Sequence, residues 1–296
     1  MQSRSYDGPG DLRRMQRLVQ DAWSLVGPKN ERHVGDVAWG ATQHVGREPE
    51  WRRQLWEEDG RLVAYGWLFR PSTLDWQLDP RRPELLHDVL DWFEAEAEES
   101  PFETSALADD ARGINILNER GYEAVHGEPW FAFLVRDLED VPEPNLPEGY
   151  TLRTVSGEGD LERRVEVHRR AWEPSRFTLE SYRNVRETWP YREDLDCVVE
   201  APDGSFAAYT LAWYDDENRV GELEPVGTAP AYRRRGLGRA VNLYALQRLK
   251  QVGAERAIVL CRGDDEYTVP KRLYESVGFR QHSRSVGFRK PGAAGS

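Results

Sequence analysis

The repetition of two short segments restricts the fold of this chain more than any other feature of its sequence. DGRLVAYGWL, which begins at Asp59, resembles DGSFAAYTLA, which begins at Asp203, and aspartate, glycine, alanine and tyrosine match at an offset of 144 residues. LNERGYEAV, from Leu117, resembles LYESVGFRQ, from Leu273. Two resemblances in the same order indicate a duplication. Because domains commonly contain about 100 to 200 residues, we expect the chain to form two related compact units.

The two copies differ in the interval between these segments. Ala64 and Gly121 are 57 residues apart, whereas the matching Ala208 and Gly278 are 70 residues apart, so the first copy is 13 residues shorter. That difference is close to the length of TAPAYRRRGLGRAV (228–241), where the first copy has LDPRRPELL instead. We therefore predict that only the second copy performs the function of this stretch.

The segment DLEDVPEPNLPEGY (137–150) separates the copies. It contains three prolines and no apolar periodicity, which is typical of an extended connector. We place the boundary near Pro144 and predict an N-terminal domain at 1–143, a C-terminal domain at 144–290 and a disordered tail at 291–296.

Apolar spacing in the second copy alternates between strand and helix periods, which predicts an α/β (mixed α+β) fold. The expected strands are 150–155, two within 197–214, 220–228, 256–262 and 283–289, and the expected helices are 161–172, 236–254 and 270–278. The first copy shows a similar but less distinct order.

Charge and composition exclude several classes of function. A net charge of -12 and a pI near 5.1 argue against nucleic-acid partners and against an anionic membrane, since both require a basic surface. No segment approaches the roughly 18 apolar residues of a membrane span, so we expect a cytoplasmic protein. Cys197 and Cys261 are interpreted as buried strand residues in a reducing compartment. No metal is expected, because histidines, cysteines and carboxylates do not occur at metal-ligand spacing.

Positive charge is concentrated in one place, at the junction of an expected strand and a long helix. Free backbone N–H groups at a helix start bind anions, and Gly236 and Gly238 let a ligand approach the backbone closely. Four nearby arginines would add charge-assisted donors, worth about 1.5–3 kcal/mol each, so a pyrophosphate would suit this turn. The alternative is a solvated helix start, which is the usual place of an isolated basic triplet.

RRRGLG (233–238) fits the R/Q-x-x-G-x-G/A signature of the GNAT superfamily of N-acetyltransferases, and LYESVGF (273–279) resembles the second motif of that family. The order of elements over 150–290 is also similar to the family's, and the first half resembles a degenerate copy. The resemblance implies two tandem GNAT-like domains, each with a central mixed, mostly antiparallel splayed sheet flanked by helices. It implies acetyl-CoA as co-substrate, with the pyrophosphate on the turn and the pantetheine arm along the strand. The implied cofactor contacts are Val226, Gly227, Thr228, Arg233, Arg234, Arg235, Gly236, Leu237, Gly238 and Arg239.

Acetylation of an amine requires its neutral form, and an alkylammonium with a pKa near 10.4 lies about three units above neutrality. Deprotonation then adds roughly 4–5 kcal/mol to the barrier unless a base accepts the proton. Glu222 and Glu224 lie two apart on the strand before the turn, so they share a face and are the candidate bases. The resemblance favours Glu222 by position, and Glu224 could replace or assist it. Alternatively, both simply face water.

Departure of the thiolate benefits from a proton donor, and the resemblance assigns that role to Tyr274, where the first copy has Asn118. The structural alternative is a tyrosine that packs on the core. The family often has an asparagine before this helix, whereas this chain has Asp264 and Asp265, which puts that cofactor contact in doubt. This acidic turn is expected to be exposed.

Three interpretations concern the surroundings of the site. The aromatic segment 170–194 could line an acceptor pocket or form the seam between the halves. His168 lies among charged residues of a helix and is expected at the surface. A nucleophile pair of Cys261 and His282 has no specific support.

Together these features predict an acetyl-CoA-dependent N-acetyltransferase that acts on a primary amine of a small molecule by direct attack in a ternary complex, as a monomer or homodimer. The alternatives are a non-catalytic acyl-CoA-binding module and an acetyltransferase of protein amines. The N-terminal half is expected to bind no cofactor and to shape the acceptor site or serve as scaffold.

Overall fold

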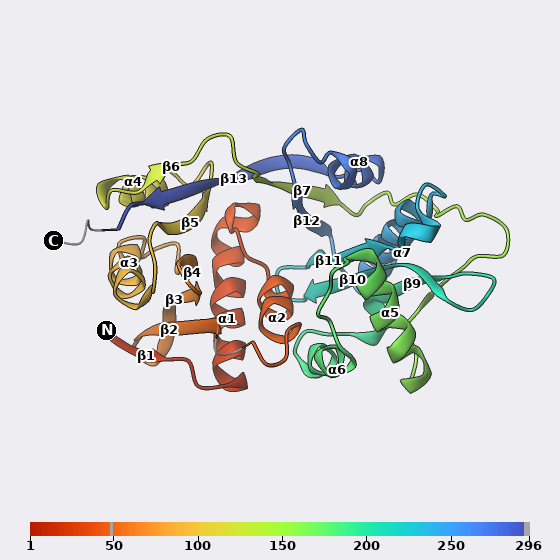
Figure 1. Ribbon diagram of the computed structural model, residues 1–296, viewed down its shortest axis with the longest axis horizontal. Helices are drawn as coiled ribbons and strands as arrows, with labels where there is room; N and C mark the ends of the chain where they lie inside the picture. Colours follow the sequence, from red (N-terminus) through yellow and green to blue (C-terminus); the bar gives the residue numbers. More distant parts are fainter. Residues whose placement is uncertain (48–49, 293–296) are drawn as a thin grey trace.

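The computed structural model describes residues 1–47 and 50–292, so residues 293–296 of the expected tail lie outside the described residues. Figure 1 shows the N-terminal half and the C-terminal half side by side, with the long strand β13 running along both. The N-terminal half contains β1 (Gln2–Ser5), α1 (Pro9–Val26), α2 (Val34–Thr42), β2 (Trp51–Glu58), β3 (Arg61–Phe69), β4 (Thr73–Leu78), α3 (Leu85–Glu96), β5 (Phe102–Leu107), α4 (Ala111–Glu119), β6 (Glu123–Ala124) and β7 (Phe131–Asp137). The C-terminal half contains β8 (Thr151–Thr154), α5 (Leu161–Ala171), α6 (Leu179–Glu187), β9 (Asp196–Glu200), β10 (Phe206–Asp215), β11 (Val220–Thr228), α7 (Leu237–Gln251), β12 (Arg256–Arg262), α8 (Val269–Ser276) and β13 (Arg280–Lys290).

The strands form one sheet in the order β1-β2-β3-β4-β5-β13-β7-β12-β11-β10-β9-β8, with β6 attached to β13. Two of the strand pairs are parallel, β4 with β5 and β11 with β12, and the others are antiparallel. The predicted fold class, a mixed α/β architecture with a mostly antiparallel sheet flanked by helices, is confirmed.

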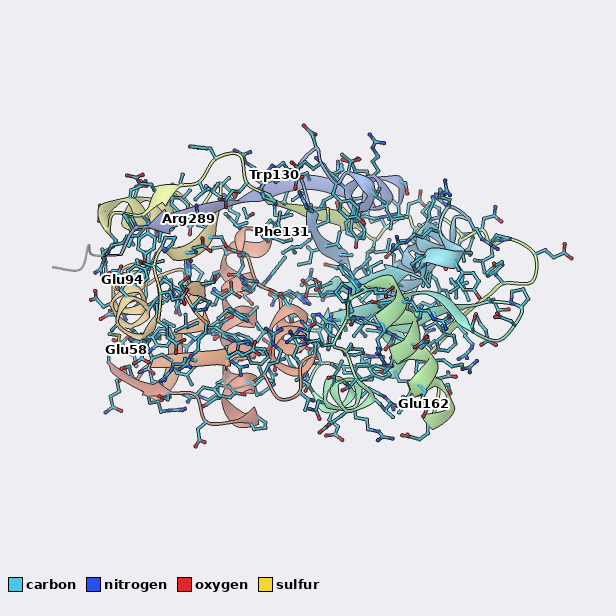
Figure 2. All side chains as sticks on the ribbon, viewed as in Figure 1. Glu58, Glu94, Trp130, Phe131, Glu162 and Arg289 are labelled. Atoms are coloured by element: carbon cyan, nitrogen blue, oxygen red, sulfur yellow. The ribbon has the colours of Figure 1, made fainter. Side chains whose placement is uncertain are left out.

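Strand β13 joins the two halves. Its first part pairs with β7 and its last part, Ser285–Lys290, pairs with β5. β7 in turn pairs with β12 along its whole length. Figure 2 shows Trp130 and Phe131 where β7 begins beneath β13. The indole of Trp130 lies so close to Gly263 that a Cβ there would come within 2.2 Å of the ring.

The elements expected for the second copy are all present. Its predicted strands correspond to β8 to β13 and its predicted helices to α5, α7 and α8. These elements could be predicted because the apolar residues in each recur with the period of a strand or of a helix. Cys197 on β9 and Cys261 on β12 are buried, as expected.

Both faces of β10 are covered. Ala208 and Ala212 pack in the cluster that contains α7, whereas Tyr209, Leu211 and Trp213 pack in the cluster that contains α5 and part of α2. Such continuous burial explains why the strand reads as an unbroken apolar run.

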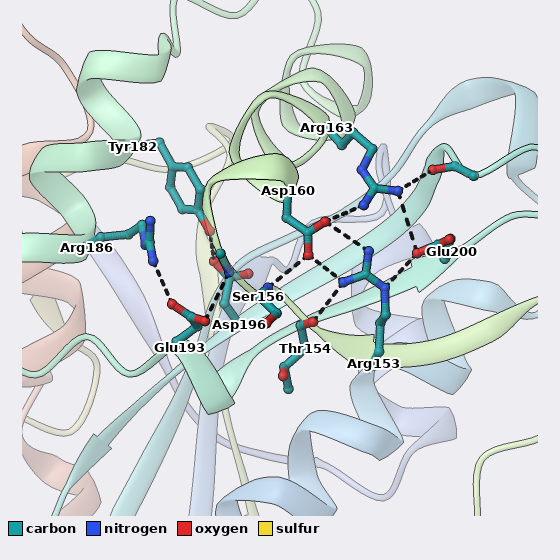
Figure 3. Close-up of polar contacts among 12 residues, drawn as sticks. Arg153, Thr154, Ser156, Asp160, Arg163, Tyr182, Arg186, Glu193, Asp196 and Glu200 are labelled. Carbon is teal, nitrogen blue, oxygen red and sulfur yellow. Dashed lines mark hydrogen bonds and ion pairs between the residues drawn. The ribbon is translucent and has the colours of Figure 1, made fainter.

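A network of ion pairs fastens the edge strand β8 to the start of α5 (Figure 3). Arg153 donates to Glu200 at 2.6 Å and also binds Asp160, whose carboxylate accepts from the backbone N–H of Ser156 at 2.8 Å. Arg163 completes the network through Asp160. These contacts hold β8, the outer strand of the C-terminal part of the sheet, against α5 and β9.

Helix α2 belongs to the N-terminal half but packs on β10 and β11 of the C-terminal half. The approach depends on Gly35, because a Cβ at this position would lie 2.2 Å from Cγ of Trp213. Nearby, the amide of Gln20 on α1 donates to Asp215 at 2.7 Å. The N-terminal half therefore touches the strand that leads into the turn.

Candidate active site

The sheet forks between β11 and β12. The two strands pair only from Val220 to Glu222, opposite Arg256 to Ile258, although β11 continues to Thr228 against β10. Beyond the fork, the edge of β11 that faces β12 has no registered strand partner within the described residues. An exposed strand edge offers backbone donors and acceptors to an extended ligand, which is the arrangement expected for Val226, Gly227 and Thr228.

The arginine–glycine turn follows directly. Gly236 has a left-handed conformation (φ +79°) at the start of α7, and no side chain caps that helix. Its first N–H groups are therefore available to an anion. A Cβ on Gly238 would lie 3.2 Å from the hydroxyl of Thr228, so the small residue keeps the helix start close to the strand end. The backbone fits the pyrophosphate cradle expected from the sequence.

Arg233, Arg234 and Arg235 are exposed and Arg239 is partly buried, and two of these four arginines are already oriented by the protein. Arg233 donates to the carbonyl oxygens of Thr228 and Ala171, at 3.2 and 3.3 Å. Arg235 donates to the hydroxyl of Tyr150 at 2.9 Å. Arg234 adopts a positive φ of 62°, which bends the backbone just before the glycines. Because the side chains of Arg233 and Arg235 are already held in place, less conformational entropy is lost when a ligand binds to them.

The two candidate bases have different surroundings. Glu222 is 1% exposed, and its carboxylate lies 3.1 Å from Nδ1 of His33, which is fully buried. The backbone N–H of Asp36 also donates to it. Burial raises the pKa of Glu222, with the contact to His33 acting against that shift. Burial also opposes protonation of His33, but the bond to Glu222 more than compensates and raises the pKa of the imidazole.

Glu224 lies just past the fork, where the pairing of β11 with β10 shifts by one residue. Such a bulge re-aims the side chains next to it. The carbonyl oxygen of Glu224 accepts a hydrogen bond of 2.6 Å from Nε1 of Trp213, and its partly exposed side chain reaches a cavity. Burial, followed by the charge of Glu222, raises the pKa of Glu224 well above its ordinary value.

This cavity has a volume of about 260 Å³ and lies between the halves. Apart from Glu224, its lining comes from the N-terminal half, chiefly from α2, β3, β4 and the residues that flank them. No residue of the aromatic segment 170–194 lines it. Instead, Phe177 packs 5.4 Å from Trp39 of α2, and Gln16 of α1 donates to the carbonyl of Trp189. The part of the segment that touches the N-terminal half therefore forms a seam.

Tyr274 is on α8 and is 6% exposed. Burial, followed by the charge of Glu224, raises the pKa of its phenol well above the ordinary value. The hydroxyl is therefore protonated at neutral pH, and the raised pKa also makes it a weaker acid than an ordinary phenol. The ring packs in the core cluster that contains α7, with its centroid 6.0 Å from that of Phe279, as the structural alternative predicted.

The expectation that His168 lies at the surface is wrong. The imidazole is 6% exposed, and its Nδ1 lies 2.7 Å from the hydroxyl of Tyr209. Burial lowers its pKa to about 3, so it is neutral. The charged neighbours in sequence face solvent, whereas His168 is on the side of α5 that packs against β10. Among the acidic residues near α8, Asp264 binds Arg262 in an ion pair.

Sequence reasoning missed His33, although it contacts a candidate base. Its partner is 189 residues away, and no spacing or motif links the two. The only local signal is the position of His33 directly before α2, where Nδ1 lies 3.1 Å from the backbone nitrogen of Gly35.

The fork, the uncapped glycine turn and the tyrosine helix are the features that the resemblance to N-acetyltransferases predicts. Residues 162–279, within the C-terminal half, match the acetyltransferase (GNAT) family model. Across the described residues, 1–47 and 50–292, no group of metal-ligating side chains comes together and no helix is long and apolar enough to span a membrane.

More specifically, the chain is similar to mycothiol acetyltransferases. It is 33% identical to that of Saccharomonospora viridis over 162 residues, which cover 51% of this chain and 52% of the relative. It is 27% identical to that of Nocardiopsis dassonvillei over 272 residues, which cover 79% and 80%. The first of these alignments spans about half the length of the relative.

Solved structures share the fold over the full chain. A tandem GNAT protein from the clavulanic acid biosynthesis pathway has a TM-score of 0.69 at 16% identity and covers 100% of this chain and 99% of its own. A GCN5-related N-acetyltransferase from Sphaerobacter thermophilus has a TM-score of 0.64 at 21% identity, with coverage of 100% and 96%. The tandem arrangement expected from the repeated segments thus has a close structural counterpart.

Proposed function

We propose that this protein transfers an acetyl group from acetyl-CoA to a primary amine of a small molecule, by direct attack in a ternary complex. One observation carries the proposal: Glu224 lies where the fork between β11 and β12, next to the glycine turn, meets a cavity of acceptor size. The same carboxylate can therefore reach an amine in the cavity and lie beside a thioester held along β11.

Acetyl-CoA, when bound, supplies the acetyl thioester. Glu224 accepts a proton from the acceptor ammonium, and its raised pKa makes it a stronger base than an ordinary glutamate. The phenol of Tyr274 gives its proton to the departing sulfur. Glu222 is paired with His33 and buried, so we assign it the positioning of β11 rather than proton transfer.

We further propose that residues 144–290 contain the one cofactor site and that residues 1–143 contain none. In the N-terminal half, β4 is followed by α3, whose first turn, like that of α7, has no side-chain cap. The segment LDPRRPELL (78–86) between them, however, lacks the glycine pair of the second copy. The N-terminal half instead lines the acceptor cavity.

Calorimetric titration with acetyl-CoA tests the cofactor site. We expect one site per chain, lost in Gly236→Glu, because a side chain at φ +79° strains the turn and its carboxylate repels pyrophosphate. Gly127→Glu is the matched control, since Gly127 has a similar positive φ (+82°) with nothing near its Cβ. Absence of binding at millimolar acetyl-CoA would refute the proposal.

Turnover is tested separately by the release of free thiol in the presence of candidate amines. Amine-dependent release supports catalysis. Binding of acetyl-CoA with no release for any amine, protein amines included, would instead favour a non-catalytic acyl-CoA-binding module.

A further inference from the structure

The cavity beside Glu224 contains more negative than positive charge. Arg32 forms ion pairs with Asp36 and Asp75, and Glu31 lies 3.5 Å from the same guanidinium. Asp36 and Asp75 line the cavity with Arg32, so two carboxylates face one cation there, whereas Glu31 is outside the lining and has a pKa raised to about 7 by burial. Burial also raises the pKa of Asp75. Glu224, from β11, adds a further carboxyl group to the lining, and this group carries a charge above its own raised pKa.

Positive groups elsewhere in the lining do not offset this charge. Arg47 is paired with Glu50. Burial lowers the pKa of His44, so its imidazole is neutral near pH 7. An anionic ligand would therefore be repelled, whereas a cation would be attracted before any specific contact forms.

The remaining wall is aromatic. Trp67 stacks on Phe69 with ring centroids 5.1 Å apart, and Trp51 meets the edge of Trp67 at 5.7 Å. Trp67 is 3% exposed, yet its indole N–H has no hydrogen-bond partner among the described residues. The guanidinium of Arg53 lies over the ring of Trp67, 3.8 Å from its centroid, so this wall already makes one cation–π contact.

We propose that the acceptor is a small cationic amine that carries an aromatic or other flat apolar group and no acidic group. The inference rests on the proposed acetyltransferase function and names its substrate class. The ammonium lies toward Glu224, Asp36 and Asp75, and the flat group lies against Trp51, Trp67 and Phe69. A volume of about 260 Å³ is just below the roughly 300–1,000 Å³ of pockets for drug-sized ligands, so the acceptor is compact.

The test compares 2-phenylethylamine with phenylalanine, which differ by one carboxylate. We expect 2-phenylethylamine to bind at least tenfold more tightly in calorimetry and to release thiol from acetyl-CoA more efficiently. Butylamine, which lacks the ring, should bind at least tenfold more weakly than 2-phenylethylamine.

Two variants assign this binding to the cavity. Asp75→Asn leaves Arg32 less neutralised, so the dissociation constant for 2-phenylethylamine should rise about tenfold with the affinity for acetyl-CoA unchanged. Trp51→Leu removes part of the aromatic wall and gives a second reading if Asp75→Asn does not fold. Asp88→Asn is the control, because Asp88 is exposed on α3 and outside the cavity.

Each outcome of these binding experiments either supports or overturns the proposed acceptor class. Equal or tighter binding of phenylalanine, no binding of 2-phenylethylamine at millimolar concentration, or no effect of either cavity variant would overturn the inference, even if other amines are acetylated. Conversely, cavity-dependent binding of 2-phenylethylamine by a protein that does not bind acetyl-CoA would support the acceptor class and refute the proposed function.

Discussion

The pair His33–Glu222 connects the halves, and its removal should cost a measurable and asymmetric amount of stability. Both side chains are buried, at 0% and 1% exposure. His33→Leu leaves a buried carboxylate without its partner, which typically costs about 3–5 kcal/mol. Because Nδ1 of His33 donates its proton to Glu222 in this pair, it does not also accept from Gly35, and no capping cost is added. Glu222→Leu leaves a neutral imidazole that keeps its other contacts, so we expect only about 1–3 kcal/mol.

The double variant distinguishes pairing from packing. With both partners apolar, the unpaired charge is gone, so the loss should be far below the sum of the single losses. Urea unfolding followed by tryptophan fluorescence measures all three variants. His126→Leu, at an exposed position, is the control and should change stability by less than about 0.5 kcal/mol.

The same cycle predicts a pH dependence. Because the folded-state pKa of His33 is raised, its contribution is complete below the ordinary histidine pKa and is lost as pH rises through the folded value. The difference between wild type and His33→Leu should therefore shrink as pH rises through the folded-state pKa of His33. At lower pH, Glu222 of the variant takes up a proton because burial raises its pKa and its partner is gone, so the comparison is made above that range. Single losses that simply add, or a difference that grows across the His33 titration, would refute the reasoning.

Three further predictions concern the site. Glu224→Gln should abolish the rise of the acetylation rate with pH, since the base acts only above its pKa, which lies above that of an ordinary glutamate. If the pH–rate profiles of the wild type and Glu224→Gln are the same, Glu224 is not the base. Tyr274→Phe should lower kcat by about 100-fold with the affinity for acetyl-CoA unchanged in calorimetry, and an unchanged kcat would remove the phenol from the mechanism. Gly35→Ala should destabilise the protein by about 1–3 kcal/mol and reduce turnover, because the added Cβ would clash with Trp213, whose indole N–H binds the backbone of Glu224. Gly10→Ala is the control, because the space around its Cβ is open. Equal stability of the two variants would contradict the tight packing of α2.

The sequence was informative where the determining contacts are local. Alternation and helical spacing located β8 to β13 together with α5, α7 and α8, and the glycines of the turn predicted a helix start that is indeed left-handed at Gly236. The sequence predicts Glu222 and Glu224 as a pair of candidate bases. It does not predict that their surroundings differ, because this difference depends on a bulge at the fork and on a histidine from the other half.

Contacts between distant segments were hidden for the same reason. His168 was misplaced because its charged neighbours outweighed the one face of α5 that packs inward. The sequence left open whether 170–194 lines a pocket or forms a seam, and the cavity that we propose for the acceptor is lined by residues between Arg32 and Asp75 together with Glu224. The spacing of apolar residues predicts a strand or a helix, but it does not predict which element of the other half that strand or helix will contact.

Strands β7 and β13 pair across the two halves at the centre of the sheet, and this pairing affects how the molecule assembles. β5 is complete early in synthesis, but the strand that covers its edge, β13, is the last element of the fold. The N-terminal half therefore presents an open edge until the final strand leaves the ribosome, and an open edge readily pairs with another chain. Cutting the chain within the connector near Pro144 would leave one fragment without the cover of β5 and the other without β7, so the halves should be produced together, as one polypeptide or by co-expression.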